Sequence, residues 1–292
     1  MNSSFTGSGV ALVTPFSPDG SIDFEGLKKL LHHVVSGKSD YVVVNGTTAE
    51  SPTVNGQECD SILRFVKEHI GNKIPIVLGV GGNNTAEVLV KIEKTDFSGV
   101  AGILSVSPYY NKPSQNGIFL HYSKIADKSP VPVLLYNVPG RTGSNISAKT
   151  TIKLSEHPNI AGIKEANSDL TQSLEIIKYA RKGFSLISGD DMLTVPMIAL
   201  GGKGVISVLA NAFPSQFSAM VKHSLENRFK EAVDILKLFT SLNPLMYEEG
   251  NPVGIKFVLQ QLGITSDHVR LPLATASDEL KVKIKEALKE IV

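Results

Sequence analysis

The sequence predicts an α/β fold, a closed (β/α)8 TIM barrel followed by a C-terminal helical appendage. Three observations lead to this prediction. Short apolar runs rich in β-branched residues recur, at 10–16, 41–44, 74–80, 102–106, 131–136, 160–164, 184–187 and 204–209. The segments between them carry apolar residues at helical spacing, as in Leu27, Leu30, Leu31 and Val34. The runs number about eight, as a closed parallel barrel requires.

A doubly wound open sheet is the competing fold. Such a sheet usually has a glycine-rich phosphate-binding loop after its first strand. Here the first run leads into the segment 14–20, Thr-Pro-Phe-Ser-Pro-Asp-Gly, which has no such spacing. Glycines do follow the third run, at 79–82, but they lack the full spacing and the lysine of a phosphate loop. The barrel is therefore favoured.

The chain divides into two expected parts. Residues 1–214 form the barrel with the active site, and residues 215–292 form a C-terminal helical domain. From about 215 onward only helical periodicity is found, as in 229–238 and 280–288, with breaks at Asn243-Pro244 and Asn251-Pro252.

Charge and composition exclude several classes of partner. The net charge is +1, from 29 Lys and Arg against 28 Asp and Glu, which predicts neither a nucleic-acid nor a membrane partner. The single cysteine, Cys59, excludes an intrachain disulfide and fits a reducing compartment. Residues 1–7 lack the basic and apolar regions of a signal peptide, and no stretch is long enough to span a membrane. We expect a cytoplasmic protein.

Lys164 is the anomalous residue of the sixth run. The stretch that contains this run, 159–166, is typical of a strand buried on both faces, where an ammonium group is costly. A neutral amine in such a place can attack a carbonyl group, so Lys164 is a candidate Schiff-base lysine. Two ordinary alternatives remain open: the side chain reaches the surface, or it pairs with a carboxylate such as Glu165.

Polar residues follow several of the other runs, where barrel enzymes place their chemistry. Thr47 and Thr48 follow the second run. Their hydroxyl groups are suited to bind a small carboxylate, and the alternative role is to cap the N-terminus of a helix. Tyr110 follows the fourth run beside Tyr109, where packing is the alternative role. Arg141 lies beyond the fifth run and suits a bidentate grip on a carboxylate, or else a surface ion pair.

Metal catalysis is not expected. None of the seven histidines forms an HxH or HExxH spacing. The absence of such a spacing disfavours a zinc-dependent aldolase, which leaves a lysine as the electron sink.

Six motifs stand at the ends of the predicted strands: 46–51 (GTTAES), 108–113 (PYYNKP), 136–143 (YNVPGRTG), 162–166 (GIKEA), 188–191 (SGDD) and 204–208 (GVISV). Together they resemble the dihydrodipicolinate synthase family of pyruvate-dependent class I aldolases, which also contains N-acetylneuraminate lyase. The resemblance covers nearly the whole chain and continues into Asn251-Pro252 and 270–273.

The resemblance implies a lyase that condenses pyruvate with L-aspartate 4-semialdehyde to 4-hydroxy-tetrahydrodipicolinate, the first committed step of diaminopimelate and lysine synthesis. Lys164 matches the Schiff-base lysine, and this covalent bond to pyruvate replaces any cofactor. Tyr136 matches the proton donor and acceptor, and Thr47 and Tyr110 complete its relay. In the family the residue matching Tyr110 comes from a neighbouring subunit, which implies at least a homodimer and commonly a tetramer, a dimer of dimers.

Further matches concern binding. Thr48, Gly189 and Ile206 match positions that hold pyruvate, and Arg141 matches the residue that grips the second substrate's carboxylate. Feedback inhibition by lysine is implied less clearly, because Gly56 and Cys59 stand where lysine-sensitive members have histidine. We therefore expect weak or absent inhibition, although four residues of that allosteric site do match: Ser51, Asn83, Glu87 and Tyr109.

Two other functions remain as alternatives. Cleavage of N-acetylneuraminate or of a keto-deoxy sugar acid would use the same lysine and tyrosine, but Arg141 and the Tyr109-Tyr110 pair resemble the synthase pattern. A non-catalytic binding protein could use the same fold, since fold alone does not fix function.

Overall fold

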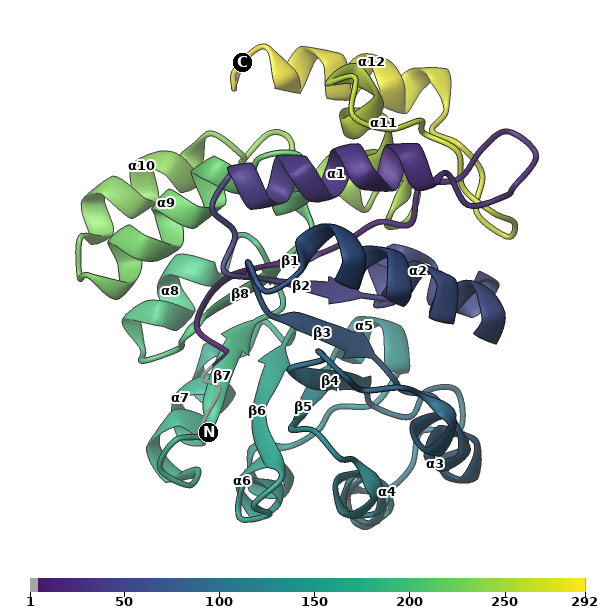
Figure 1. Cartoon of the computed structure of the whole chain (residues 1–292). Helices are drawn as coiled ribbons and strands as arrows, with labels where there is room; N and C mark the ends of the chain where they lie inside the picture. The colour runs from purple at the N-terminus through teal and green to yellow at the C-terminus, as the bar shows by residue number, and fades with distance from the viewer. Residues whose placement is uncertain (1–4, 292) are drawn as a thin grey trace.

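The chain forms a closed barrel of eight parallel strands in sequence order, seen in Figure 1 with its helices on the outside. The computed structural model describes residues 5–291. Residues 1–4, within the stretch for which we expect no signal peptide, and residue 292 lie outside this range. The predicted TIM barrel is confirmed. Its strands are β1 (Gly7–Ala11), β2 (Tyr41–Val44), β3 (Ile76–Gly79), β4 (Gly102–Val106), β5 (Val133–Asn137), β6 (Ile160–Glu165), β7 (Ser185–Ser188) and β8 (Gly204–Ser207).

Twelve α-helices are present in the described residues, with four short 3-10 helices. The α-helices are α1 (Phe24–Ser36), α2 (Gly56–Ile70), α3 (Thr85–Lys94), α4 (Gln115–Lys128), α5 (Pro139–Thr142), α6 (Ala148–Ser155), α7 (Leu170–Tyr179), α8 (Thr194–Ala199), α9 (Pro214–Leu225), α10 (Phe229–Lys237), α11 (Val253–Gln261) and α12 (Asp278–Leu288). The 3-10 helices are η1 (Thr47–Ala49), η2 (Ser51–Thr53), η3 (Leu209–Asn211) and η4 (Pro244–Met246).

The first strand lies earlier than the apolar run 10–16 predicts. Its central Gly9 packs so closely on Tyr41 that an added Cβ would lie 2.3 Å from the tyrosine ring. Small residues with this role give no apolar signal, so the sequence pattern missed the strand's start. Beyond Ala11 the chain leaves the sheet, and the Val13 N–H binds the Asn211 side chain at 3.1 Å.

The barrel interior is a packed core and not a pore. Inward-facing residues from the strands fill it, among them Tyr41, Leu134, Ile187 and Ile206. A second, larger apolar cluster lies between the strands and the outer helices. The chemistry is therefore confined to the mouth of the barrel, where the strands end.

The C-terminal helices continue the fold beyond β8. α9 packs against β1, α1 and α8, which gives it the place of the eighth helix around the barrel. In Figure 1, α11 and α12 lie beyond α1 at the top of the view. The expected division at residue 214 stays a prediction.

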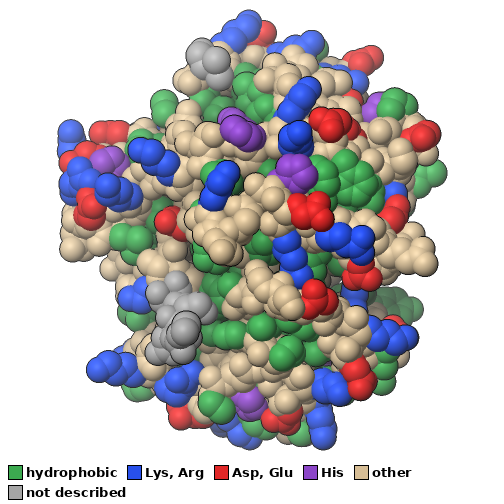
Figure 2. Space-filling view, in the orientation of Figure 1, with side chains coloured by type: hydrophobic (Ala, Val, Ile, Leu, Met, Phe, Trp, Pro, Cys, Tyr) green, Lys and Arg blue, Asp and Glu red, His purple; other side chains and the backbone are tan. Residues whose placement is uncertain are grey.

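The distribution of charge on the surface agrees with the near-neutral net charge of the sequence. Figure 2 shows basic and acidic side chains interspersed over the visible face. No helix within residues 5–291 has the length and hydrophobicity needed to cross a membrane.

Candidate active site

Lys164 and Tyr136 stand side by side at the mouth of the barrel. They are direct partners in the register of β5 and β6, so both side chains point to the same face of the sheet. Lys164 is 5 % exposed and Tyr136 is 7 % exposed. The Lys164 Nζ lies 4.5 Å from the centroid of the tyrosine ring. An amine and a phenol are thus held together in a largely enclosed place.

Neither ordinary role expected for Lys164 fits the structure. At 5 % exposure its side chain does not reach the surface. Glu165 cannot pair with it, because successive residues of a strand point to opposite faces. The Glu165 carboxylate instead accepts hydrogen bonds from Asn137 Nδ2 at 2.8 Å, Gln172 Nε2 at 3.1 Å and the Asn167 N–H at 2.8 Å. Burial raises the pKa of Glu165 to about 7, and these donors oppose the rise.

Gly189 and Ile206 border the lysine and the tyrosine. A Cβ at Gly189 would lie 3.1 Å from Lys164 Cε and 2.8 Å from the Cβ of Ala166, so a larger residue would crowd the lysine. Ile206 belongs to the same interior cluster as Tyr136. Glycine at position 189 therefore leaves room for the lysine side chain.

Asp191 fixes the chain that follows β8. It is buried, and its Oδ2 accepts the N–H groups of Val208 and Leu209 at 3.2 and 2.9 Å. Burial raises the pKa of Asp191 to about 6, while hydrogen bonds to the carboxylate oppose this. Asp191 thereby stabilises the loop directly after the strand that carries Ile206.

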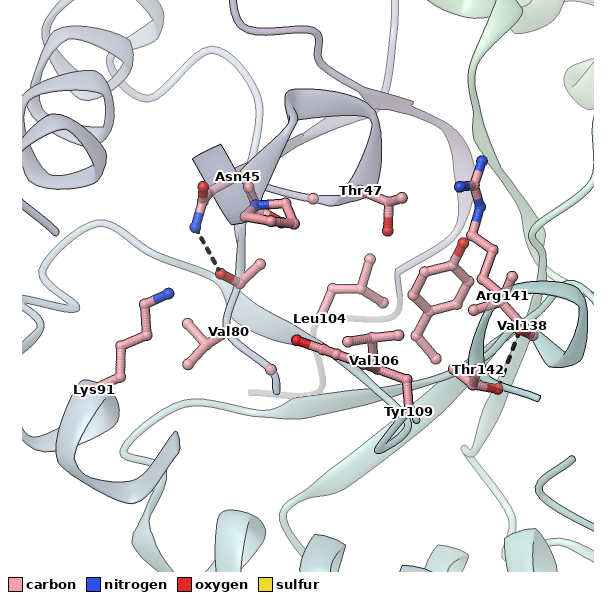
Figure 3. Close-up of a pocket in the computed structure, with 16 residues that line it drawn as sticks. Asn45, Thr47, Val80, Lys91, Leu104, Val106, Tyr109, Val138, Arg141 and Thr142 are labelled. Carbon is pink, nitrogen blue, oxygen red and sulfur yellow. Dashed lines mark hydrogen bonds between the residues drawn. The ribbon is translucent and has the colours of Figure 1, made fainter. Parts of the chain in front are cut away.

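A cavity of about 390 Å³ opens in front of Tyr136. Thr47 and Arg141 also line it, and Figure 3 shows both toward one side of the cavity, with Lys91 at the opposite side. Lys164 is not one of the lining residues, because it lies beside the ring of Tyr136. The cavity thus offers a hydroxyl, a phenol and a guanidinium to a small ligand.

Thr48 is oriented by a distant residue. Its Oγ1 is buried and accepts a hydrogen bond from Asn251 Nδ2 at 3.0 Å. Since the oxygen accepts this bond, the hydroxyl proton of Thr48 is free to be donated elsewhere. Thr47 and Thr48 both lie in η1, which Gly46 precedes. Neither threonine is the N-cap residue of this short helix.

The two tyrosines after β4 differ in their surroundings. Tyr109 lines the cavity, whereas Tyr110 is 85 % exposed and does not line it. Tyr110 also has a φ of 76°, which is unusual for a residue with a side chain. Within this chain the structure does not bring Tyr110 to Tyr136, and it excludes the packing role for Tyr110.

The residues expected to bind lysine are only partly gathered. Ser51 and Tyr109 line the cavity, while Asn83 and Glu87 are exposed and do not line it. Cys59 is buried in α2, and Gly56 begins that helix with no atom within 4 Å of where its Cβ would be. Lys91, which the sequence gave no reason to select, places an ammonium group at the same cavity.

Two further residues near the site, Asn251 and Tyr247, were assigned no role in the sequence analysis. Asn251 is 203 positions from Thr48, and only the fold brings them together. Burial of the phenol group raises the pKa of Tyr247 well above its ordinary value of 10, and the charges of Asp191 and Asp190 act in the same direction. Asn251-Pro252 belongs to the stretch that resembles the family, but an asparagine or a tyrosine near a proline is a common sequence, and neither residue carried a signal for a role at the site. Within residues 5–291 no three His, Cys, Asp or Glu side chains gather as a metal site would require.

Known proteins resemble this chain over almost its entire length. The model of the Dihydrodipicolinate synthetase family matches residues 4–291. The 4-hydroxy-tetrahydrodipicolinate synthase of Cytophaga hutchinsonii is 56 % identical over 283 residues, 97 % of this chain and 95 % of that relative. A solved monomeric dihydrodipicolinate synthase variant superposes with a TM-score of 0.95 at 34 % identity, over 99 % of this chain and 97 % of that one. The dihydrodipicolinate synthase of Cyanidioschyzon merolae, solved with lysine bound, superposes with a TM-score of 0.93 at 36 % identity, over 98 % of each chain.

Proposed function

Because the chain belongs to the dihydrodipicolinate synthetase family, we propose that Lys164 and Tyr136 carry out the family's reaction through a Schiff base. The reaction condenses pyruvate with L-aspartate 4-semialdehyde to 4-hydroxy-tetrahydrodipicolinate, the first committed step of diaminopimelate and lysine synthesis. The enzyme is a lyase. The observation that carries the proposal is the pairing of Lys164 with Tyr136, Nζ to ring at 4.5 Å, beside the cavity.

Catalysis begins at the amine of Lys164. The neutral amine adds to the ketone of pyruvate, and loss of water gives an iminium. The iminium draws electrons from the neighbouring methyl group, which loses a proton and becomes an enamine. The enamine carbon then forms a bond to the aldehyde carbon of the second substrate, whose oxygen takes up a proton. The amino group of that substrate finally replaces Lys164 at the iminium carbon, which closes the ring and frees the lysine.

Tyr136 moves the protons of these steps. A phenol is a weak base at neutral pH, so it needs partners that pass the proton onward. Thr47 lines the same cavity and is one partner. Tyr110 is the other, supplied by a neighbouring subunit. Arg141 lines the same cavity as Tyr136 and Thr47.

The substrate carboxylates are held on two sides of this pair. Thr48 donates its hydroxyl proton to the pyruvate carboxylate, because its oxygen is already occupied by Asn251. Gly189 and Ile206 complete the pyruvate site, and Arg141 binds the carboxylate of the semialdehyde. No metal or organic cofactor takes part, since the iminium itself is the electron sink.

The proposal requires at least a homodimer. Tyr110 is 85 % exposed and held at positive φ, which supports a role toward a second copy of the chain. A dimer of dimers would extend this arrangement. Sedimentation velocity distinguishes the states, and a purely monomeric enzyme with full activity would contradict the role of Tyr110.

Borohydride trapping tests the chemistry. Intact mass is measured after incubating the protein with pyruvate and borohydride, alongside the Lys164→Ala variant. We expect one reduced pyruvyl group on the wild type and none on the variant. The control is Lys178→Ala, which removes an exposed lysine of α7 and should keep the adduct. A wild type without adduct would refute the Schiff-base mechanism.

A further inference from the structure

A buried ion pair lies directly beside the loop that carries Thr47 and Thr48. Glu50 follows η1 in the chain, and Lys256 belongs to α11. Lys256 is 0 % exposed, and its Nζ lies 2.6 Å from Glu50 Oε1. The same Nζ donates to the His268 carbonyl at 2.7 Å. Two segments about 200 residues apart are thus joined by opposite charges inside the protein.

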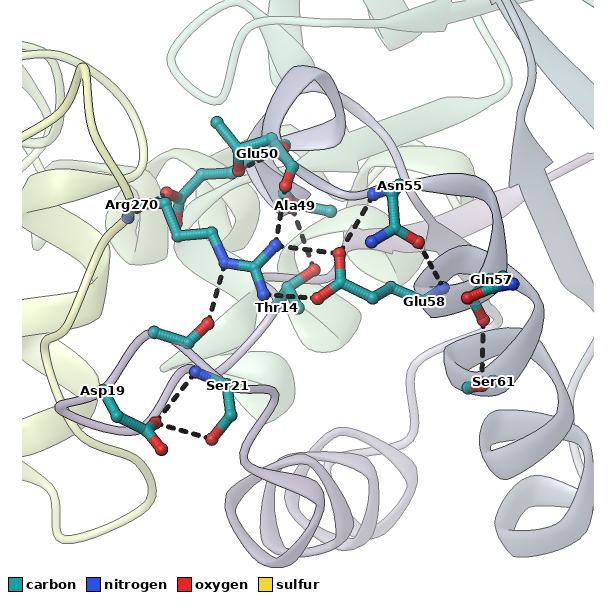
Figure 4. Close-up of polar contacts among 12 residues, drawn as sticks. Thr14, Asp19, Ser21, Ala49, Glu50, Asn55, Gln57, Glu58, Ser61 and Arg270 are labelled. Atoms are coloured by element: carbon teal, nitrogen blue, oxygen red, sulfur yellow. Dashed lines mark hydrogen bonds and ion pairs between the residues drawn. The ribbon is translucent and has the colours of Figure 1, made fainter.

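Arg270 encloses the same carboxylate from the other side. Its backbone N–H donates to Glu50 Oε2 at 2.9 Å. Its guanidinium forms hydrogen bonds with both carboxylate oxygens of Glu58 and with the carbonyl of Thr53 at 2.6 Å, as Figure 4 shows in part. Both oxygens of Glu50 are therefore held by the C-terminal segment 256–270.

The conformation of Glu50 needs this support. Its φ of 56° and ψ of 39° are left-handed, a region that residues with side chains seldom adopt. Such a conformation persists where surrounding contacts determine it. A break in these contacts would let the backbone of Glu50 relax, and η1 would move with it.

The C-terminal segment also reaches the threonines directly. Asn251 lies five positions before Lys256 and donates to Thr48 Oγ1 at 3.0 Å. On its other side the loop is held by Thr14, whose hydroxyl donates to the Ala49 carbonyl at 2.9 Å. Contacts thus converge on residues 48–50 from both ends of the chain.

We propose that Glu50, held by Lys256 and Arg270, is a positioning residue that fixes η1, the short helix that carries Thr47 and the pyruvate-binding Thr48. The proposal rests on the role of Thr48 in the proposed function. A buried ion pair is weak evidence for stability alone, and its best-attested use is to specify one arrangement. Here the arrangement specified is the loop that faces the substrate.

Three variants separate positioning from stability. Glu50→Gln keeps the size of the side chain and an acceptor for the Arg270 N–H but removes the charge. Adding Lys256→Met to it removes the unpaired ammonium that Glu50→Gln would leave buried. Glu58→Gln is the matched control, because Glu58 binds the outer side of Arg270 and does not touch the loop.

The measurements are the Michaelis constant for pyruvate, the turnover number and the midpoint of thermal unfolding. Small displacements of binding groups have large kinetic effects, so we expect Glu50→Gln to raise the Michaelis constant about tenfold or more. The double variant should regain most of the thermal-unfolding midpoint that Glu50→Gln loses, while its Michaelis constant for pyruvate stays raised. Glu58→Gln should lower the midpoint and leave the Michaelis constant within about twofold of the wild type.

Two results would overturn the proposal. The first is a double variant in which both the midpoint of thermal unfolding and the Michaelis constant for pyruvate return to their wild-type values. The second is a Michaelis constant that rises as much in Glu58→Gln as in Glu50→Gln. If Glu50→Gln does not fold, the double variant alone decides. Borohydride trapping of the wild type runs in parallel. An adduct there together with unchanged Michaelis constants refutes the positioning role only, whereas a missing adduct refutes the proposed function.

Discussion

Two lysines are buried within residues 5–291, and their surroundings are opposite in kind. Lys256 is enclosed completely and lies 2.6 Å from the carboxylate of Glu50. Lys164 is 5 % exposed, and within residues 5–291 no ion pair joins it to a carboxylate. Its neighbours are the ring of Tyr136 and the glycine at 189. The first lysine is paired with a carboxylate, and the second lies beside the cavity-lining Tyr136 without such a partner among the described residues.

Under the proposed function, one of these lysines serves the structure and the other serves the chemistry. Burial lowers the pKa of Lys256 to about 8, and the charge of Glu50 opposes this fall. A lysine with such a partner holds two segments together and cannot easily reach a substrate. A lysine without a partner is costly to the fold, but its amine can form a bond. The predictions below test this division.

Removal of the amine at Lys164 should have the largest effect. We expect Lys164→Ala to lower turnover by about a thousandfold or more, because no other group can form the iminium. The midpoint of thermal unfolding should remain near that of the wild type, since no ion pair is lost. Steady-state rates and calorimetry on the same preparation measure both. A large loss of stability in Lys164→Ala would mean that Lys164, like Lys256, stabilises the fold, which would contradict the contrast between the two lysines.

Lys256→Met should have the reverse effect, a loss of stability without loss of the Schiff-base reaction. It leaves the buried carboxylate of Glu50 unpaired, which typically costs about 3 to 5 kcal/mol of unfolding free energy. Denaturant unfolding measures this loss. At saturating pyruvate the variant should still form the borohydride adduct, because Lys164 is intact. A variant as stable as the wild type would show that the pair contributes nothing to the fold.

Two buried tyrosines extend the contrast. Tyr136→Phe should lower turnover about a hundredfold or more with little change in the Michaelis constant for pyruvate, as expected for a proton-transfer group. Tyr122 is also buried, but its hydroxyl donates to the Ser105 carbonyl at 2.9 Å. Tyr122→Phe should therefore cost about 1 kcal/mol of stability and leave turnover unchanged. If Tyr136→Phe changed only binding, its proton-transfer role would be refuted.

Glu165 should make stability depend on pH. Its pKa is raised by burial to about 7 from a usual value of 4.5, so the folded protein holds a proton that the unfolded chain releases. Its stabilising effect is complete below pH 4.5 and is lost as the pH rises through about 7. We expect the free energy of unfolding to fall by on the order of 1 kcal/mol per pH unit across this window.

Glu165→Gln supplies the control for that slope. Denaturant unfolding at several pH values should show a smaller slope in the variant. The slope should not vanish, because Asp191, whose pKa is raised to about 6, acts in the same direction. An unchanged slope would mean that Glu165 ionises normally inside the protein.

The sequence predicted the barrel well because the signal is local. Each strand is a short apolar run and each helix a periodic one, so the eight units can be counted without knowing the tertiary structure. β1 was displaced because Gly9 contributes close packing on Tyr41, which no apolar pattern reports. The pairing of Lys164 with Tyr136 also follows from local information, since both lie at the ends of neighbouring strands.

Contacts from the C-terminal segment could not be predicted in this way. Asn251, Lys256 and Arg270 reach the loop 48–50 across about 200 residues. In sequence Lys256 is a single lysine within a mainly apolar stretch, 253–259, and exposure is the ordinary expectation for a lysine side chain. Only the packing of α11 against the barrel shows that it is buried.

Inhibition by L-lysine should be the weakest effect. Ser51 and Tyr109 line the cavity, but Gly56 and Cys59 bring no imidazole, and Lys91 adds an ammonium group where a cationic effector would approach. Like charges at about 4 Å in a solvated place repel by about 1 kcal/mol, which lowers affinity several-fold. We expect little inhibition by millimolar L-lysine in initial-rate assays. Lys91→Met should strengthen it a few-fold, whereas Lys94→Met, on the same helix but away from the cavity, should not. Clear inhibition of the wild type would instead mean that the four matching residues suffice and that the charge of Lys91 is screened by solvent.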